Sequence, residues 1–241
     1  VIAVITTEMK KHTPYIIADG HHLYETAIKY RDEMRKKSPD APPDAAFNYV
    51  MVTLVSLDDP GLVVLPTHRL IHSYSKMDGQ AMLKAAGRYF DVCNVPDLGA
   101  VRDALADADP ELPRYGFYDG SYSVMQLKSL DIMGDLFPQW SSDFRQLDAA
   151  VLHELVIERV MGLSKESVAG RENLTYLRDP NPGLAAVDSG EANFLFLLNP
   201  TRIGHVRACT LAGERMPQKS TDFFPKVPSG LVALPLYDEI K

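Results

Sequence analysis

The sequence lacks the features that mark several classes of protein. It has only 2 cysteines in 241 residues, and Cys93 and Cys209 are too far apart to show the spacing of zinc ligands. We therefore expect reduced thiols in a cytoplasmic protein rather than a disulfide. There is no apolar run of membrane-spanning length and no signal-peptide pattern. The net charge of −7 argues against a general nucleic-acid partner, and we expect no membrane partner.

The composition that remains is typical of a globular protein. Hydrophobic residues make up 46% of the chain and charged residues 24%. Strand-like and helix-like segments alternate irregularly and show no repeat period, which predicts an α+β (mixed α/β) fold. No segment has the composition of a linker between folded units, so we expect residues 1–241 to form a single α+β unit.

Four segments give the clearest local predictions. Residues 24–37 have apolar positions at helical spacing and predict an amphipathic helix. Residues 48–61 give the strongest strand pattern in the chain, closed by a Pro-Gly turn. Residues 114–128 predict a hairpin around an Asp-Gly turn. Residues 142–163 predict the longest helix, on which we expect Asp148 to pair with an arginine on a solvated face.

The segment Asp19-Gly20-His21-His22, here called the elbow, joins an apolar run to the amphipathic helix. Gly20 permits a positive φ. The first amide N–H groups of the following helix lack partners, and together with the helix dipole they favour an anion, most often phosphate. Imidazoles can donate to phosphate oxygens, while Asp19 can cap the helix, accept from a ligand or help to hold a divalent cation. A plain N-cap with packed histidines is the alternative, and zinc is a weaker one because no third ligand has a recognisable spacing.

Two further clusters carry cations beside polar groups. His68 and Arg69 follow a buried-type strand, and the planar guanidinium suits phosphate or carboxylate. Lys219, Ser220 and Thr221 lie in an extended segment just after a predicted helix. The lysine could neutralise a transferred phosphoryl group while the hydroxyls orient it. The alternative for the first cluster is a surface arginine beside an edge-strand histidine, and for the second a C-terminal strand with an exposed Lys-Ser-Thr.

Five stretches resemble one family in the same order along nearly the whole chain: "YIIADGHHLYETAIKYRDE", "LPTHRLI", "LDAAVLHELVIERVMGL", "NFLFLLNPTRI" and "GERMPQKSTDFFPKVPSGLV". They are similar to the bacterial and archaeal family called domain of unknown function 1015. This resemblance implies a ParB/sulfiredoxin-like element near the N-terminus, joined to a larger mixed sheet with helices. Because family members are normally longer at the N-terminus, the resemblance also implies that this chain is the C-terminal portion of a longer architecture.

The elbow is in turn similar to a segment of free-serine kinases built on the ParB/sulfiredoxin-like fold. That resemblance implies that the elbow borders a nucleotide and a small substrate with a hydroxyl group. The sequence departs from the pattern at Leu23, where an arginine is usual, and Arg69 is the cation that could replace it. A catalytic carboxylate would be expected in the family's leading portion, before Val1.

Together these observations lead to a nucleotide-dependent, kinase-like phosphotransferase acting on a small hydroxyl-bearing metabolite such as a free amino acid, with ATP or ADP and Mg²⁺ as cofactors. Three residues are the catalytic candidates: Asp19, His22 and Lys219. Six residues are the candidates for binding phosphate or nucleotide: Gly20, His21, His68, Arg69, Ser220 and Thr221. No firm metal ligand is predicted, although Asp19 could reach Mg²⁺. The alternative is a non-catalytic protein that binds a nucleotide or phosphorylated metabolite, and a small metal-dependent hydrolase is a third possibility.

Overall fold

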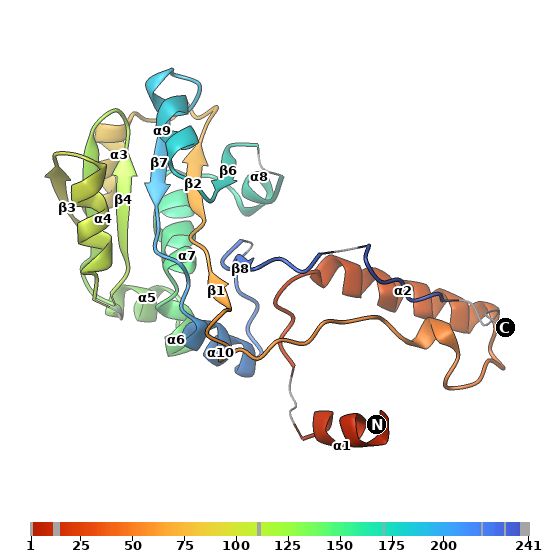
Figure 1. Cartoon of the computed structure of the whole chain (residues 1–241). Coiled ribbons are helices and arrows are strands. Elements are labelled where there is room, and N and C mark those ends of the chain that lie inside the picture. Colours follow the sequence, from red (N-terminus) through yellow and green to blue (C-terminus); the bar gives the residue numbers. More distant parts are fainter. Residues whose placement is uncertain are drawn as a thin grey trace. The chain divides into compact units, whose positions relative to one another are not determined.

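A computed structural model describes residues 2–11, 15–109, 112–170, 172–217, 219–228 and 230–236. The chain divides into two compact units. Unit 1 comprises Val1–Val63 and Phe223–Lys241, and unit 2 comprises Val64–Asp222. Both contain helices and strand residues, and their elements are labelled in Figure 1. The α+β class predicted from the sequence is confirmed.

Unit 2 is built on an antiparallel sheet. Among the described residues, six strands pair in the order β3-β5-β4-β7-β2-β6, and every adjacent pair is antiparallel. The strands are β2 (His68–Ile71), β3 (Phe90–Val95), β4 (Arg114–Tyr118), β5 (Tyr122–Leu127), β6 (Leu174–Leu177) and β7 (Phe194–Leu197). The predicted hairpin is confirmed as β4 and β5, which pair with each other on either side of the Asp119-Gly120 turn. Gly120 takes the positive φ of 101° that this turn requires.

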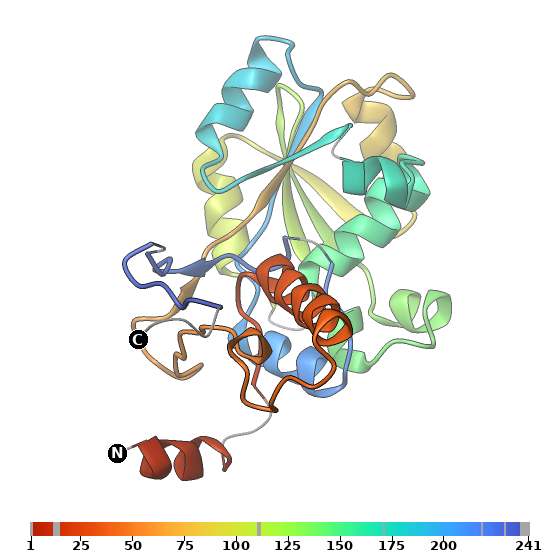
Figure 2. The same ribbon diagram turned by 90° about the vertical axis from the view of Figure 1, so that its right-hand side faces the viewer.

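Helices cover both faces of this sheet (Figure 2). The helices of unit 2 are α3 (Gly79–Ala86), α4 (Leu98–Ala106), α5 (Asp131–Leu136), α6 (Ser142–Arg145), α7 (Asp148–Val151), η2 (Leu152–Val160), α8 (Lys165–Gly170), α9 (Asn181–Asp188) and α10 (Ile203–Leu211). The strand side chains alternate between the faces, as the two-residue period of a strand requires. Phe117 and Phe196 pack in the core with α3 and η2, whereas Leu195 and Leu197 pack with α4 and α9.

The predicted long helix is broken. Leu147 has an extended backbone, with ψ of 118°, and this separates α6 from α7. After α7 the chain continues as η2, a π-helix of 9 residues. The Met161 N–H donates to the Val156 carbonyl, five residues back, as in a π-helix. The helix predicted over 142–163 was therefore correct in type, but the backbone leaves the helical conformation at Leu147 and changes from α- to π-winding at Leu152.

Unit 1 has little buried surface in the described residues. Its elements are α1 (Ile2–Met9), α2 (His21–Lys37), η1 (Ala46–Asn48) and β8 (Phe223–Phe224). The boundary between the units falls within β1 (Val63–Val64). The amphipathic helix prediction is confirmed as α2, but none of its residues is buried. The strand prediction over 48–61 is wrong, since residues 49–56 are exposed and none of them is paired in a sheet. Apolar side chains alone do not make a strand without a partner for the backbone.

Candidate functional site

The elbow lies at the start of α2, and its three side chains are exposed. Gly20 has the predicted positive φ, 76°, and the helix begins without a side-chain cap. Asp19 accepts from the Gly20 N–H at 2.8 Å and from Lys226 at 2.7 Å, so its carboxylate is engaged away from the helix interior. The rings of His21 and His22 lie 3.9 Å apart between centroids. The elbow belongs to unit 1, whereas the other predicted site residues belong to unit 2.

Arg69 lies on β2, between β7 and the edge strand β6, and only 1% of its surface is exposed. Its guanidinium donates to the Thr67 carbonyl, to the Lys219 carbonyl at 3.2 Å and to His153 Nε2 at 3.4 Å. The ring of Tyr176 lies 5.3 Å from the guanidinium carbon. Burial lowers the pKa of Arg69 to about 10, so the group remains a cation at neutral pH. Arg69 therefore acts as a buried positive charge held by the protein's own acceptors.

The histidines next to Arg69 are neutral. Burial, aided by the charge of Arg69, lowers the pKa of His153 to about 3 and that of His68 to about 4. His68 Nδ1 accepts from the Leu198 N–H at 3.2 Å, which joins β2 to the segment after β7. His68 is thus used within the fold, and it is 6% exposed.

The predicted Lys219-Ser220-Thr221 cluster does meet Arg69, but through its backbone. The Lys219 carbonyl accepts from Arg69, and the Ser220 carbonyl accepts from the Thr201 hydroxyl. The Ser220 hydroxyl donates to the Pro217 carbonyl at 2.7 Å and is buried. The Lys219 side chain is exposed and Thr221 is partly buried. The segment therefore links the buried cation to Thr201, which lines a pocket.

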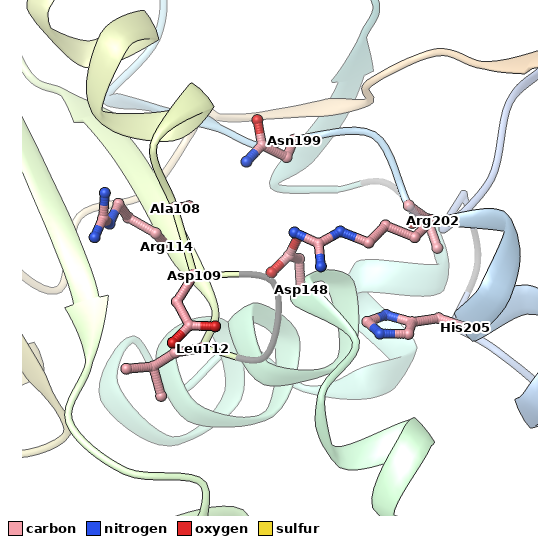
Figure 3. Close-up of a pocket in the computed structure, with 9 residues that line it drawn as sticks. Ala108, Asp109, Leu112, Arg114, Asp148, Asn199, Arg202 and His205 are labelled. Carbon is pink, nitrogen blue, oxygen red and sulfur yellow. The ribbon is translucent and has the colours of Figure 1, made fainter.

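That pocket is lined by residues from four parts of unit 2: Ala108, Asp109, Leu112, Arg114, Asp148, Asn199, Thr201, Arg202 and His205. They come from the region after α4, the start of β4, the start of α7 and the segment that enters α10 (Figure 3). The cavity volume is about 10 Å³, so it has room for about one water molecule or one ligand oxygen atom. Most of the lining residues are polar or charged.

Among the titratable groups that line the pocket, Asp148 has the most strongly shifted pKa. Burial raises its pKa from 3.8 to about 7, while the charges of Arg202 and Arg69 act in the opposite direction. The Arg202 side chain points toward the Asp148 carboxylate (Figure 3). A carboxylate poised near pH 7 beside a cation can take up a proton at neutral pH, which is what a general base must do.

An arginine and a histidine also border the same pocket. Arg114 donates to the Ala104 carbonyl at 2.5 Å and to Gln126, which fixes its guanidinium at the start of β4. Burial, followed by the charge of Arg202, lowers the pKa of His205. The lining therefore combines two carboxylates, Asp109 and Asp148, with two permanent cations and an imidazole.

Sequence reasoning missed the main residues of this pocket. Asp148 was expected on a solvated face, paired with an arginine of its own helix; it is half-buried and faces Arg202 instead. Asn199 and Arg202 lie in the stretch "NPTR", directly after the buried strand β7. Polar residues that follow a buried strand are the signal that could have identified them.

The family model described as Protein of unknown function (DUF1015) matches residues 1–150. The chain belongs to this family. The match covers the elbow, Arg69 and Asp148, and it confirms the family resemblance found in the sequence. No curated protein matches the chain.

Three solved structures resemble this member of the family, each over 71% of the chain. One is a conserved hypothetical protein from Pyrococcus furiosus, with 17% identity, a TM-score of 0.40 and 60% of its chain covered. Another is a free serine kinase in complex with AMP, with 16% identity, a TM-score of 0.41 and 57% coverage. A point mutant of free serine kinase, also in complex with AMP, has 14% identity, a TM-score of 0.42 and 57% coverage. The chain thus spans about three fifths of the length of each structure it matches.

Proposed function

We propose that this protein is a nucleotide-dependent phosphotransferase that acts on a small hydroxyl-bearing metabolite such as a free amino acid. The observation that carries the proposal is Asp148, a carboxylate with a pKa of about 7 that faces Arg202 in a polar pocket. Phosphoryl transfer requires mainly the positioning of two oxygens and the neutralisation of charge, and this lining supplies both. We place this activity in the cytoplasm, in keeping with the two free cysteines.

Asp148 is the proposed base. The substrate hydroxyl enters the narrow pocket, its oxygen forms a bond to the terminal phosphorus of the nucleotide, and the phosphorus–oxygen bond to the leaving diphosphate or monophosphate breaks. The hydroxyl proton passes to the Asp148 carboxylate. Arg202, Arg114 and His205 offset the charge of the phosphoryl oxygens. Arg69 stays behind the pocket and acts through its field, because its donors are held by protein acceptors.

ATP or ADP is the proposed phosphoryl donor, with Mg²⁺. Among the described residues, no three histidine, cysteine, aspartate or glutamate side chains are grouped so that they could hold a metal ion. This fits Mg²⁺, which proteins usually bind through one or two carboxylates together with the phosphates of the substrate. In this pocket Asp148 and Asp109 are the carboxylates that could contribute.

The elbow is a proposed anion site within unit 1. Its exposed His21 and His22 and the uncapped start of α2 suit phosphate oxygens. In this proposal Asp19 accepts from the substrate hydroxyl, and His22 donates to a phosphate oxygen. In unit 2, the exposed Lys219 ammonium is the proposed cation for a transferred group, with Ser220 and Thr221 beside it.

The narrowness of the Asp148 pocket favours a second function. A cavity of about 10 Å³ admits an oxygen atom but not a nucleotide, which suits a protein that binds a phosphorylated metabolite at its surface without chemistry. The two functions differ in turnover and in the role of Asp148.

Titration calorimetry with ATP and ADP, with and without Mg²⁺, and phosphorus NMR with a panel of free amino acids test the proposal. We expect nucleotide binding, turnover with at least one amino acid, and loss of turnover but not of binding in Asp148→Asn. Asp103→Asn, an exposed aspartate of α4, is the matched control and should behave like the wild type. Binding without turnover would favour the second function, and absence of binding by both nucleotides would contradict the phosphotransferase.

A further inference from the structure

A second cavity in unit 2 is larger than the Asp148 pocket and shares no residue with it. It is a groove lined by Arg88, Tyr89, Ile132, Asp135, Leu136 and Arg159, with a volume of about 340 Å³. Cavities that bind small organic ligands usually measure about 300–1,000 Å³. The groove is formed by the segment between α3 and β3, by α5 and by η2. Its volume is therefore suited to a whole small molecule rather than to one oxygen atom.

Two arginines border the groove, and aromatic rings hold both. The Arg88 guanidinium carbon lies 5.3 Å from the centre of the Tyr89 ring, and that of Arg159 lies 5.2 Å from the centre of the Phe137 ring. Phe137 in turn stacks on Trp140 at 4.3 Å, with an angle of 6° between the rings. A cation stacked on a ring keeps its in-plane N–H groups directed outward. The stacking thus positions the two guanidinium groups without using their donors.

Neither arginine forms an ion pair with a carboxylate within the part of the chain that the structure describes. Lys128 adds a third cation nearby, since its ammonium donates to the carbonyl of Gly87, the residue before Arg88. Asp135 is the one acid in the lining, and Glu158 is the neighbour of Arg159 on η2. Within the lining two arginines stand against one aspartate, and in a protein with a net charge of −7 this balance is suited to an anion.

The body of the ligand is indicated by the remaining lining. Ile132 and Leu136 are four residues apart on α5, so they lie on the same side of that helix, and both are partly buried. With Tyr89 they give the groove an apolar wall. We propose that this groove binds an amphipathic anion, a small molecule with a phosphate or carboxylate head at Arg88 and Arg159 and an apolar body against Ile132 and Leu136.

Three probes separate head from body: octyl phosphate, inorganic phosphate and octanol, each titrated into the full chain by calorimetry. We expect octyl phosphate to bind at least about tenfold more tightly than inorganic phosphate, which lacks the alkyl chain that buries apolar surface, and more tightly than octanol, which lacks the charged head. Arg88→Gln and Arg159→Gln should each weaken octyl phosphate about three- to tenfold, whereas Asp135→Asn should strengthen it about two- to threefold. Arg102→Gln, an exposed arginine of α4, is the control and should change nothing.

Further variants and one further probe distinguish binding in this groove from binding elsewhere. Asp148→Asn and Arg202→Gln should leave the tight, alkyl-dependent binding of octyl phosphate unchanged, because these residues line the other pocket, where only a phosphate oxygen fits. Loss of binding in these two variants, or equal affinity for octyl phosphate and inorganic phosphate, would overturn the proposal. So would unchanged binding in the double variant Arg88→Gln/Arg159→Gln with its thermal unfolding intact. Binding of polyglutamate without binding of octyl phosphate would assign the groove to an acidic peptide and also overturn it.

Discussion

At the scale of single residues, Asp148 combines a benefit for chemistry with a cost for stability. The folded protein keeps its carboxyl protonated up to about pH 7, whereas the unfolded chain releases the proton near pH 3.8. The folded state therefore binds more protons than the unfolded state between these values, and stability falls as the pH rises from about 4 to 7. A side chain retained at such a cost is more typical of a functional site than of a structural one.

Asp148→Asn should stabilise the protein. Because asparagine cannot ionise, the variant avoids the cost of a charged group in the pocket, and its free energy of unfolding should exceed that of the wild type by about 2 kcal/mol at pH 8. The gain should shrink as the pH falls from 7 and vanish near pH 4. Urea unfolding at pH 4, 6 and 8 measures it. Asp103→Asn provides the baseline, and a destabilised Asp148→Asn would show that the carboxylate makes a net favourable interaction.

His153 contributes to the loss of folding stability at acid pH. Its folded pKa of about 3 lies below the unfolded value of 6.5, so the unfolded state binds the extra proton, and stability is lost as the pH falls below 6.5. His68 behaves in the same way, with a folded pKa of about 4. His153→Gln keeps an acceptor for Arg69. Between pH 6 and 4.5 it should reduce the slope of the free energy of unfolding against pH by the amount that corresponds to the uptake of about one proton on unfolding. Chemical unfolding across that range measures the slope, and an unchanged slope would mean that the His153 ring is protonated in the folded state.

At the scale of helices and strands, local patterns were correct where local chemistry determines the result. The hairpin of β4 and β5 followed from an Asp-Gly turn, and α2 from apolar spacing. The pattern over 48–61 was misleading, because pairing depends on a partner strand that no local window contains. For the same reason Arg69 and Ser220 could be identified as polar candidates, but the hydrogen bonds of Arg69 to the Lys219 carbonyl and of Thr201 to the Ser220 carbonyl could not. Asp148 and Arg202 are 54 positions apart in the sequence and come together only through the fold.

Gly116 allows α4 to pack closely on the sheet. A Cβ atom at this position in β4 would lie 2.3 Å from Val101 Cγ1 and 3.1 Å from Leu197 Cβ, both in buried side chains. Gly116→Ala should therefore lower the free energy of unfolding by about 2 kcal/mol. Gly204→Ala in α10 is the matched control. It meets open space and should leave stability equal or raise it by about 0.5 kcal/mol. Equal effects in the two variants, measured by urea unfolding, would contradict close packing at Gly116.

At the scale of the whole molecule, the two units differ in how they bury their residues. Unit 2 contains the six-stranded sheet with its two-sided core, whereas unit 1 leaves many large apolar side chains exposed, including Leu54 and Val55. Among the described residues, no helix is long and apolar enough to cross a membrane. The expectation that residues 1–241 form a single unit stays a prediction, and a single calorimetric unfolding transition would support it.

Residues 49–56 should be the first site of proteolysis. The segment is exposed and extended, and it forms no strand, so its backbone can enter a protease without unfolding a sheet. Brief digestion with chymotrypsin should cut there first and leave a resistant fragment that contains unit 2. Mass spectrometry identifies the cut. A first cut within the β4–β5 hairpin would mean that the core of unit 2 is less stable than its burial indicates.

The winding of η2 fixes the register between the two cavities. A π-helix accommodates one residue more per turn than the α-helix it replaces. Removing a single residue from 152–160 has two possible structural outcomes. If the segment relaxes toward α-winding, the residues after it keep their places. If it keeps its winding, every later side chain turns by about 100° about the axis, and Arg159 leaves the Phe137 ring. Asp148 lies before the segment and keeps its place in both cases, so the length and winding of this segment together set where Arg159 stands relative to Asp148.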